Sequence, residues 1–317
     1  MSDTLDVLAV GYPSLDRIIR LKTPPRIGQT ALITNENSDQ HFFGGCAVNI
    51  TCLLSSLGRR CGLVMTFGKD FESSGFRSFL QRHDLCLNRV TWNHQFKTSY
   101  STLIISPDGE HITLFYPGPM QPHLYCDYPL KGLCTRVGLI TIGELNGNRH
   151  FLEQCILQKI PIVFSMKGDF ESMDQDYLSL VFENSQLIFM NAAEQLQLED
   201  YMPLPVFSYL NSNHKLDAIV VTNGAQGSTI YQRNHTLHIP AVQGLTIRDT
   251  TGGGDAYIAG FLSEYLQEAP DYLACGIAGT ALSSFIIESY GCLTQIPTSE
   301  QFEERKKKLS EEIEHVN

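Results

Sequence analysis

Three consecutive glycines, Gly252, Gly253 and Gly254, run directly into Asp255 and an apolar segment with helical spacing. Glycine is unfavourable inside a helix, so a run of glycines at the start of one indicates a backbone shaped for a purpose. A helix start offers unpaired N–H groups and the positive end of the helix dipole. Because glycines have no Cβ atoms, an anion could approach these groups closely. The pattern therefore predicts an anion-binding site.

The position of Asp255 next to this predicted anion site indicates which reaction could take place there. A carboxylate there would repel a bound phosphate, unless it takes a proton from a hydroxyl that attacks the phosphate. The glycine turn would then stabilise the transferring group, so the combination indicates phosphoryl transfer. On the turn alone, an alternative stays open in which Asp255 only caps a helix behind a glycine-rich loop.

The composition restricts the class of protein and its compartment. The 317 residues, 43% of them hydrophobic, suffice for one large α/β domain or two ordinary ones. A net charge of −11 argues against nucleic-acid binding, which usually needs a basic face. No apolar run reaches the ~18 residues of a membrane span, and the N-terminus does not resemble a signal peptide. Nine cysteines without a CxxC pair favour reduced thiols. We therefore expect a cytoplasmic protein with no nucleic-acid or membrane partner.

The elements that must position the glycine turn are short apolar runs separated by helical segments. Runs that are apolar on both faces are typical of parallel strands covered on both sides. Buried strands are predicted at 5–11, 61–68, 137–143, 160–165, 186–191 and 216–224. Helices are predicted at 47–58, 74–83, 272–291 (buried) and 300–317 (solvated). This alternation predicts a doubly wound α/β fold with a mostly parallel sheet flanked by helices.

Two regions depart from this alternation. Residues 12–43 contain prolines and short extended pieces, and residues 98–116 alternate polar and apolar around an Asp108-Gly109 turn typical of a hairpin. We expect 12–43 and 96–117 to form a small β-sheet within a single domain of residues 1–317. This sheet could be a lid over the α/β crevice or a decorative insertion, and the sequence leaves both open.

Four segments, in this order along the chain, resemble the PfkB/ribokinase family of carbohydrate and nucleoside kinases. They are "GGCAVNITCLLSSLGRRCGLVMTFG", "NAAE", "VTNGAQGS" and "DTTGGGDAYIAGFL", the last similar to the family pattern D-T-x-G-A-G-D. The resemblance covers most of the chain. It implies a ribokinase-like fold with a small β-sheet lid, and transfer of phosphate from ATP, with Mg²⁺, to an alcohol.

On the acceptor side, the resemblance implies that Asp255 is the catalytic base and that the glycine turn is the anion hole. The residues it places around the acceptor substrate are Asp16, Gly44, Gly45 and Asn49. Structural alternatives remain open here. Gly44 and Gly45 could serve only the strand-to-helix turn, and Asp16 could be a solvated loop acid.

On the nucleotide side, Thr222, Gly224 and Gly227 match the nucleotide-binding turn of the family. Asn191 and Glu194 match the motif that organises magnesium through water. The two glycines could instead be ordinary turn residues. Asn191 and Glu194 could also form a helix-capping pair, a role compatible with metal organisation.

Some positions depart from the family pattern or extend it. Gly253 replaces a common alanine, which should leave the anion hole intact and make it more flexible. Ser165 stands where many members have an aspartate after the middle strand, so the metal network need not be a copy of theirs. A potassium ion is a further cofactor to consider, held by Asp249 and residues 289–291.

The substrate class rests on two local similarities. "HITLFYPGPM" and "FIIESYGC" are more similar to the adenosine and nucleoside kinase branch than to fructokinases. This favours transfer to the 5′-hydroxyl of a ribonucleoside, whose base needs an aromatic surface. Phe43, Phe115 and Tyr116 are candidates for it, although packing in a hinge core is the favoured interpretation of Phe115.

Alternatives to a nucleoside kinase are kept. The first is a ribokinase or another sugar kinase of the same family, and the second is a non-catalytic homologue that only binds a ligand. An exposed edge of the small sheet could also pair two subunits into a homodimer.

Overall fold

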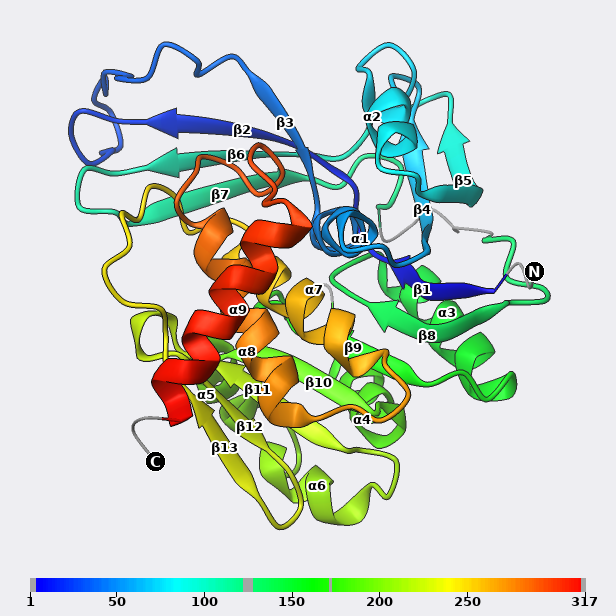
Figure 1. Cartoon of the computed structure of the whole chain (residues 1–317). Coiled ribbons are helices and arrows are strands. Elements are labelled where there is room, and N and C mark those ends of the chain that lie inside the picture. The colour runs from blue at the N-terminus through cyan, green and yellow to red at the C-terminus, as the bar shows by residue number, and fades with distance from the viewer. Residues whose placement is uncertain (1–3, 122–127, 171–172, 315–317) are drawn as a thin grey trace.

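The computed structural model describes residues 4–121, 128–170 and 173–314. It contains a nine-stranded sheet with the order β13-β12-β11-β10-β9-β8-β1-β4-β5 and a separate four-stranded sheet (Figure 1). The strands of the larger sheet are β1 (Leu5–Val10), β4 (Cys61–Gly68), β5 (Cys86–Asn93), β8 (Thr135–Ile140), β9 (Ile162–Ser165), β10 (Leu187–Asn191), β11 (Ala218–Thr222), β12 (Ser228–Tyr231) and β13 (Thr236–Ile239).

The larger sheet is parallel from β5 through β11, and only β12 and β13 are antiparallel. All six predicted buried strands are present, and residues of β4 and β9 are buried throughout. The mostly parallel, doubly wound fold is confirmed. Strands β5, β12 and β13 were not predicted, because their exposed positions interrupt the continuous apolar pattern.

Helices cover both faces of this sheet and bury two separate clusters of apolar side chains. One cluster includes residues of α1 (Cys46–Ser56), α2 (Phe76–Arg82), α7 (Gly253–Tyr265), α8 (Tyr272–Ile286) and α9 (Ser299–Glu314). The other includes residues of α3 (Leu145–Leu157), α4 (Gln175–Asn184), α5 (Ala192–Tyr201) and α6 (Tyr209–Ser212). The predicted helices correspond to α1, α2, α8 and α9, and α8 is the buried one.

The four-stranded sheet, called the lid sheet below, contains β2 (Ser14–Arg20), β3 (His41–Gly44), β6 (Tyr100–Ile105) and β7 (His111–Tyr116) in the order β3-β2-β6-β7. Strands β6 and β7 form the predicted hairpin, with Tyr100 opposite Tyr116. Strand β2 pairs with β6 in parallel, which joins the two predicted segments. Figure 1 shows the lid sheet beside one end of the larger sheet.

The arrangement places loops from several strands at one edge. The segments that follow β1, β8, β9 and β10, together with the last residue of β11, line a single cavity. In open parallel sheets, ligands bind where the carboxyl ends of the strands meet. The lid sheet faces this edge, so the fold prepares a site between the two sheets.

Two expectations from composition can be compared with the described residues. None of their helices is both long and apolar enough to cross a bilayer. Their cysteines are free thiols, and Cys126 lies outside the described residues.

Candidate active site

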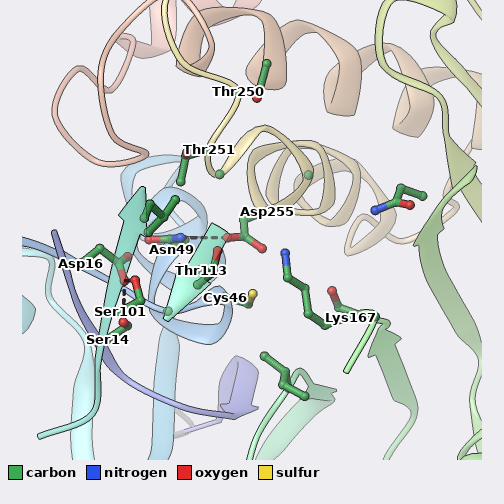
Figure 2. Close-up of a pocket in the computed structure, with 18 of the residues that line it drawn as sticks. Ser14, Asp16, Cys46, Asn49, Ser101, Thr113, Lys167, Thr250, Thr251 and Asp255 are labelled. Atoms are coloured by element: carbon green, nitrogen blue, oxygen red, sulfur yellow. Dashed lines mark hydrogen bonds between the residues drawn. The ribbon is translucent and has the colours of Figure 1, made fainter. Parts of the chain in front are cut away.

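A cavity of about 950 Å³ lies between the lid sheet and the carboxyl end of the larger sheet. The lid sheet contributes Asp16, Ser101, Leu103, Ile105, Thr113 and Phe115 to its wall. The larger sheet and the start of α7 contribute Ser165, Lys167, Asn191, Glu194, Thr222, Asp249, Gly252, Gly254 and Asp255. The glycine turn and the predicted substrate-binding acid therefore face one space (Figure 2).

The glycine turn forms the start of α7, and each glycine has a different reason to be there. Gly252 precedes the helix with a φ of 79°, and a Cβ on it would lie 2.4 Å from the Cβ of Cys292. A Cβ on Gly253 would lie 3.0 Å from Cγ2 of Ile287, so tight packing explains the missing alanine better than added flexibility does. A Cβ on Gly254 would meet nothing within 4 Å. Gly252 and Gly254 line the cavity, and no side chain of the described residues caps the helix.

Asp255 lies in the first turn of α7, partly exposed to the cavity. Its Oδ2 accepts a hydrogen bond of 2.8 Å from Nδ2 of Asn49. Burial raises the pKa of the Asp255 carboxyl, and this effect is opposed by the Asn49 hydrogen bond and the nearby Lys167 ammonium. The carboxylate is thus held in a fixed orientation at the start of α7, a geometry compatible with a general base.

Asn49 connects the first helix to this carboxylate across 206 residues of sequence. The Asn49 side chain is buried, and its Oδ1 has no hydrogen-bond partner among the described residues. A buried polar atom without a partner is costly, so a hydroxyl of a bound ligand would fit there. Asn49 can therefore orient Asp255 and contact a substrate at the same time.

Asp16 is fixed on β2 by two neighbouring hydroxyls. Its Oδ1 accepts hydrogen bonds from Ser14 and Ser101. Burial raises the pKa of the Asp16 carboxyl, and these two hydrogen bonds oppose the shift. Asp16 is therefore a cavity residue and not a solvated loop acid. Its Oδ2 makes no hydrogen bond to the described residues and can accept one from a ligand.

Gly44 and Gly45 shape the junction between β3 and α1. A Cβ on Gly44 would lie 2.6 Å from Oδ2 of Asp16, so this glycine makes room for the carboxylate. Gly45 has a φ of 101°, and a Cβ on it would lie 2.2 Å from the carbonyl oxygen of Tyr12. Gly45 lines the cavity. Gly44 does not, and it affects the site only through the space that it leaves for the Asp16 carboxylate.

The predicted nucleotide-binding residues are only partly brought together. Thr222 ends β11 and lines the cavity, but Gly224 and Gly227 are not part of its wall. A Cβ on Gly227 would lie 2.1 Å from the carbonyl oxygen of Ile239, which gives this glycine a structural reason. Gly224 begins a short 3-10 helix (Gly224–Gln226) and is exposed.

Asn191 and Glu194 form a capping box at the start of α5. The Glu194 amide donates to the Asn191 side chain at 2.9 Å, and the Asn191 amide donates to Oε2 of Glu194 at 2.8 Å. Both residues also line the cavity. Burial raises the pKa of the Glu194 carboxyl, opposed by its backbone hydrogen bonds and by Lys167. Capping therefore leaves the pair facing the cavity, where it can also act on a ligand.

The side chains of Asn191 and Glu194 offer oxygen atoms of the kind that bind magnesium. Carboxylate and amide oxygens are ligands that magnesium prefers. No cluster of three or more His, Cys, Asp or Glu side chains that could hold a metal occurs in the described part of the chain. These residues therefore fit a magnesium ion held mainly by nucleotide phosphates and water, and not a closed protein cage.

Asp249 holds the turn before α7 in place. Its Oδ1 accepts a hydrogen bond from the Thr251 amide at 3.0 Å, and its Oδ2 accepts one from the Gly291 amide at 3.0 Å. The carboxylate thus ties the glycine turn to the segment that follows α8. Binding of potassium near Asp249 stays a prediction.

The aromatic candidates separate into cavity and core residues. Phe115 lines the cavity, is 43% exposed and contacts the Tyr12 ring at 5.0 Å, so placing it in a hinge core was wrong. Phe43 packs on Phe79 at 4.7 Å and does not line the cavity. Tyr116 pairs with Tyr100 at 4.9 Å and also lies outside the cavity wall. The prediction for Phe43 and Tyr116 was therefore wrong, because position along a strand did not reveal the face.

Some cavity residues were missed from sequence. Ser101 contacts Asp16, and Cys46 and Lys167 lie beside Asp255 (Figure 2). Ser101 and Lys167 belong to no motif with a recognisable spacing, and Cys46 lies inside the family-like segment 44–68 but had no role assigned to it. The only signal was indirect: Cys46 follows the paired glycines, and Lys167 follows a predicted strand whose carboxyl end faces the site.

Comparisons with known proteins identify the family to which the sequence is similar. The model of the pfkB family carbohydrate kinases matches residues 7–299. A nucleoside kinase of Methanocaldococcus jannaschii is 27% identical over 302 residues, which cover 95% of this chain and 97% of that protein. A nucleoside kinase of Methanothermobacter thermautotrophicus is 28% identical over 299 residues, 94% of each chain.

A solved structure gives the same result for the fold. The crystal structure of the M. jannaschii nucleoside kinase, an archaeal member of the ribokinase family, has a TM-score of 0.83 and 26% identity to this chain. The match covers 97% of this chain and 100% of that one. With the family model spanning most of the sequence, the chain belongs to the pfkB family of carbohydrate kinases and is a kinase with the ribokinase fold.

Proposed function

We propose that this kinase transfers the γ-phosphate of ATP to the 5′-hydroxyl of a ribonucleoside. The observation that carries the proposal is that Asp255 lies in one cavity with the uncapped start of α7 and with the side chains of Asp16 and Asn49. The two nucleoside kinases at 27% and 28% identity support the substrate class.

The acceptor would be held by its ribose hydroxyls. Oδ2 of Asp16 and Oδ1 of Asn49 have no hydrogen-bond partner among the described residues, and both residues line the cavity. Charged acceptors form strong hydrogen bonds with hydroxyl groups. These contacts would direct the 5′-hydroxyl at Asp255, which accepts its proton as the oxygen attacks the γ-phosphate and ADP leaves.

The nucleotide would lie on the other side of Asp255, near Thr222, Asn191 and Glu194. The amide groups of Gly254 and Asp255 at the start of α7 would stabilise the charge on the transferring phosphoryl group. Magnesium, when bound with ATP, would neutralise phosphate charge, with Asn191 and Glu194 facing it through water. A potassium ion near Asp249 would add to this stabilisation of negative charge on the phosphates.

The lid sheet would provide selectivity and exclude water. Phe115 offers a partly exposed aromatic ring next to Tyr12, where a base could stack. We further propose that residues 12–43 and 96–117 close over the substrates as part of one domain of residues 1–317, which would limit hydrolysis of ATP.

A screen of acceptors tests the function. ADP release would be measured with ATP and magnesium over nucleosides, pentoses and hexoses, with potassium added or omitted. We expect ribonucleosides to drive ADP release, and mass spectrometry to locate the phosphate on the 5′-oxygen. Release with ribose or fructose, but not with nucleosides, would replace the proposal with a sugar kinase. Thermal stabilisation by nucleosides or sugars, with no release of ADP from ATP, would indicate a protein that binds these ligands without phosphorylating them.

Two further expectations are kept as proposals. A homodimer could form through the edge of the lid sheet, where Ile112 and Leu114 on β7 are 52% and 56% exposed. Light scattering of the purified protein would give its mass. The cytoplasmic location also stays a prediction.

A further inference from the structure

Lys167 has no part in the roles described so far, although its side chain projects into the cavity. It follows β9, two residues after Ser165, and it is exposed to the cavity. Figure 2 shows its amine directed at Asp255, on the side opposite to Asn49. A lysine at the reacting carboxylate needs an explanation, because it would otherwise only weaken the base.

The ammonium of Lys167 is not committed to a carboxylate. In the described part of the chain, Lys167 forms no ion pair with any acidic side chain. Ser165, which also lines the cavity, stands where the family pattern often has an aspartate. An acid there could pair with the amine, whereas the serine leaves its three N–H donors available.

The surrounding charges keep Lys167 protonated. Its pKa is raised first by Cys46 and then, against the effect of burial, by Asp255, Glu194 and Asp16. Burial keeps the thiol of Cys46 itself protonated at neutral pH, so the carboxylates provide the attraction there. These carboxylates come from different elements around the same cavity: Glu194 from the start of α5, Asp16 from β2 of the lid sheet and Asp255 from the start of α7. Lys167 is therefore a permanent cation at the junction of the two proposed substrates.

We infer that the Lys167 ammonium binds the γ-phosphoryl group of ATP during its transfer, opposite the start of α7. The group in transit must lie between the glycine turn and Asp255, and its oxygens carry negative charge in the transition state. The helix start and the ammonium would then contact it from two directions. The inference rests on the proposed phosphotransferase function, but not on the identity of the acceptor.

The competing explanation is that Lys167 only balances the nearby acids. In that case its removal would raise the pKa of Asp255, and the lost rate would return at high pH. If Lys167 instead contacts the phosphoryl group, its removal would lower the rate at every pH, with no recovery at high pH. The two roles are therefore separated by the pH profile of kcat.

The test compares Lys167→Met with Lys167→Arg. The matched control is Lys307→Met, the same change at a lysine on α9 whose side chain is 79% exposed. We expect Lys167→Met to lower kcat by about 10²–10³-fold between about pH 6 and 9, the cost of removing one donor to a developing charge. Nucleoside KM should change less than about threefold, Lys167→Arg should keep part of the rate, and Lys307→Met should match the wild type.

Calorimetry separates this inference from the proposed function. Lys167→Met should weaken binding of ATP while leaving that of ADP unchanged, because only ATP has the γ-phosphate, and this requires no acceptor. If the wild type binds ATP but phosphorylates no nucleoside, the proposed function fails and this comparison still decides the role of Lys167. Equal effects on ATP and ADP, a kcat within threefold of the wild type, or full recovery at high pH would overturn the inference.

Discussion

The start of α7 and the lid sheet meet in one cavity, but they are built in opposite ways. At α7 the backbone itself forms the binding surface, and packing leaves little freedom: Gly252 is held against Cys292 and Gly253 against Ile287. In the lid sheet, side chains form the surface. Among the described residues, the Asp16 side chain accepts hydrogen bonds only from two serine hydroxyls, and Phe115 is 43% exposed.

This contrast separates the two tasks of the enzyme. A phosphoryl group has the same charge and shape in every reaction, so a fixed backbone site suits it. Acceptors differ in shape and hydroxyl pattern, and exposed side chains on a separate sheet can change without disturbing that site. Changes at α7 should therefore affect kcat, and changes in the lid sheet should affect KM and the choice of acceptor.

The largest effect is expected for Asp255→Asn. The amide cannot accept the hydroxyl proton, so kcat should fall by about 10²–10⁴-fold. ATP affinity, measured by calorimetry, should stay nearly the same, because the glycine turn is unchanged. Unchanged turnover in this variant would remove Asp255 as the base.

Two glycine variants test whether the backbone site can be separated from stability. Gly254→Ala has room for its Cβ and should not lower the melting temperature, since alanine is favoured over glycine in helices by about 1 kcal/mol. The methyl group would face the cavity, so kcat should still fall by about 10²-fold.

Gly252→Ala is the matched contrast, because its Cβ would collide with Cys292 and its φ of 79° is unfavourable for alanine. We expect both the melting temperature and kcat to fall. Full activity in Gly254→Ala would show that this face of α7 does not bind the phosphoryl group.

Asp16→Asn tests the lid side of the comparison. The amide keeps an oxygen for the serine hydroxyls but loses the charge that would bind the acceptor. The acceptor KM should rise by about 10–100-fold, as expected for loss of a charge-assisted hydrogen bond, with the KM of ATP unchanged. A fall in kcat with no change in KM would place Asp16 with the chemistry instead.

The pH dependence of kcat/KM should follow the carboxyl of Asp255. Burial raises its pKa, and Asn49, Lys167 and Cys46 oppose this rise; the charge of Asp255 in turn raises the pKa of the nearby Asp16 and Glu194 carboxyls. A base is active only when ionised, so a raised pKa moves the loss of activity on the acid side to higher pH. Below that pKa the rate should fall about tenfold per pH unit. A rate that stays constant down to the ordinary value of 3.8 would contradict the expected shift.

The smallest effect is expected for Phe115→Ala. Loss of one stacking surface should raise the KM of nucleosides by about 3–10-fold and leave that of ribose unchanged. Assays with each acceptor at saturating ATP would measure the ratio. An equal effect on both acceptors would mean that Phe115 supports the hinge with Tyr12 and does not contact the base.

The sequence predicted most of what depends on continuous local patterns. The buried parallel strands and α1 and α8 follow from apolar runs, and the glycine turn follows from residue type alone. Contacts that depend on the fold were not predictable: Asn49 meets Asp255 from 206 residues away. Lys167 is a single lysine after a strand, with nothing in its spacing to distinguish it. Phe43 on β3 and Phe115 on β7 lie on opposite faces of the lid sheet, which the sequence pattern did not reveal.

The uncapped start of α7 has a consequence for folding as well as for catalysis. No side chain of the described residues completes this helix, and α7 packs directly on α8 inside the molecule. The Gly253 amide already donates to the Thr250 carbonyl oxygen at 3.1 Å, so a phosphate bound there would accept from the amides of Gly254 and Asp255. Bound nucleotide would thereby stabilise the helices at the C-terminal end of the chain. The fraction of enzyme with nucleotide bound and the resistance of its C-terminal third to proteolysis should therefore rise together.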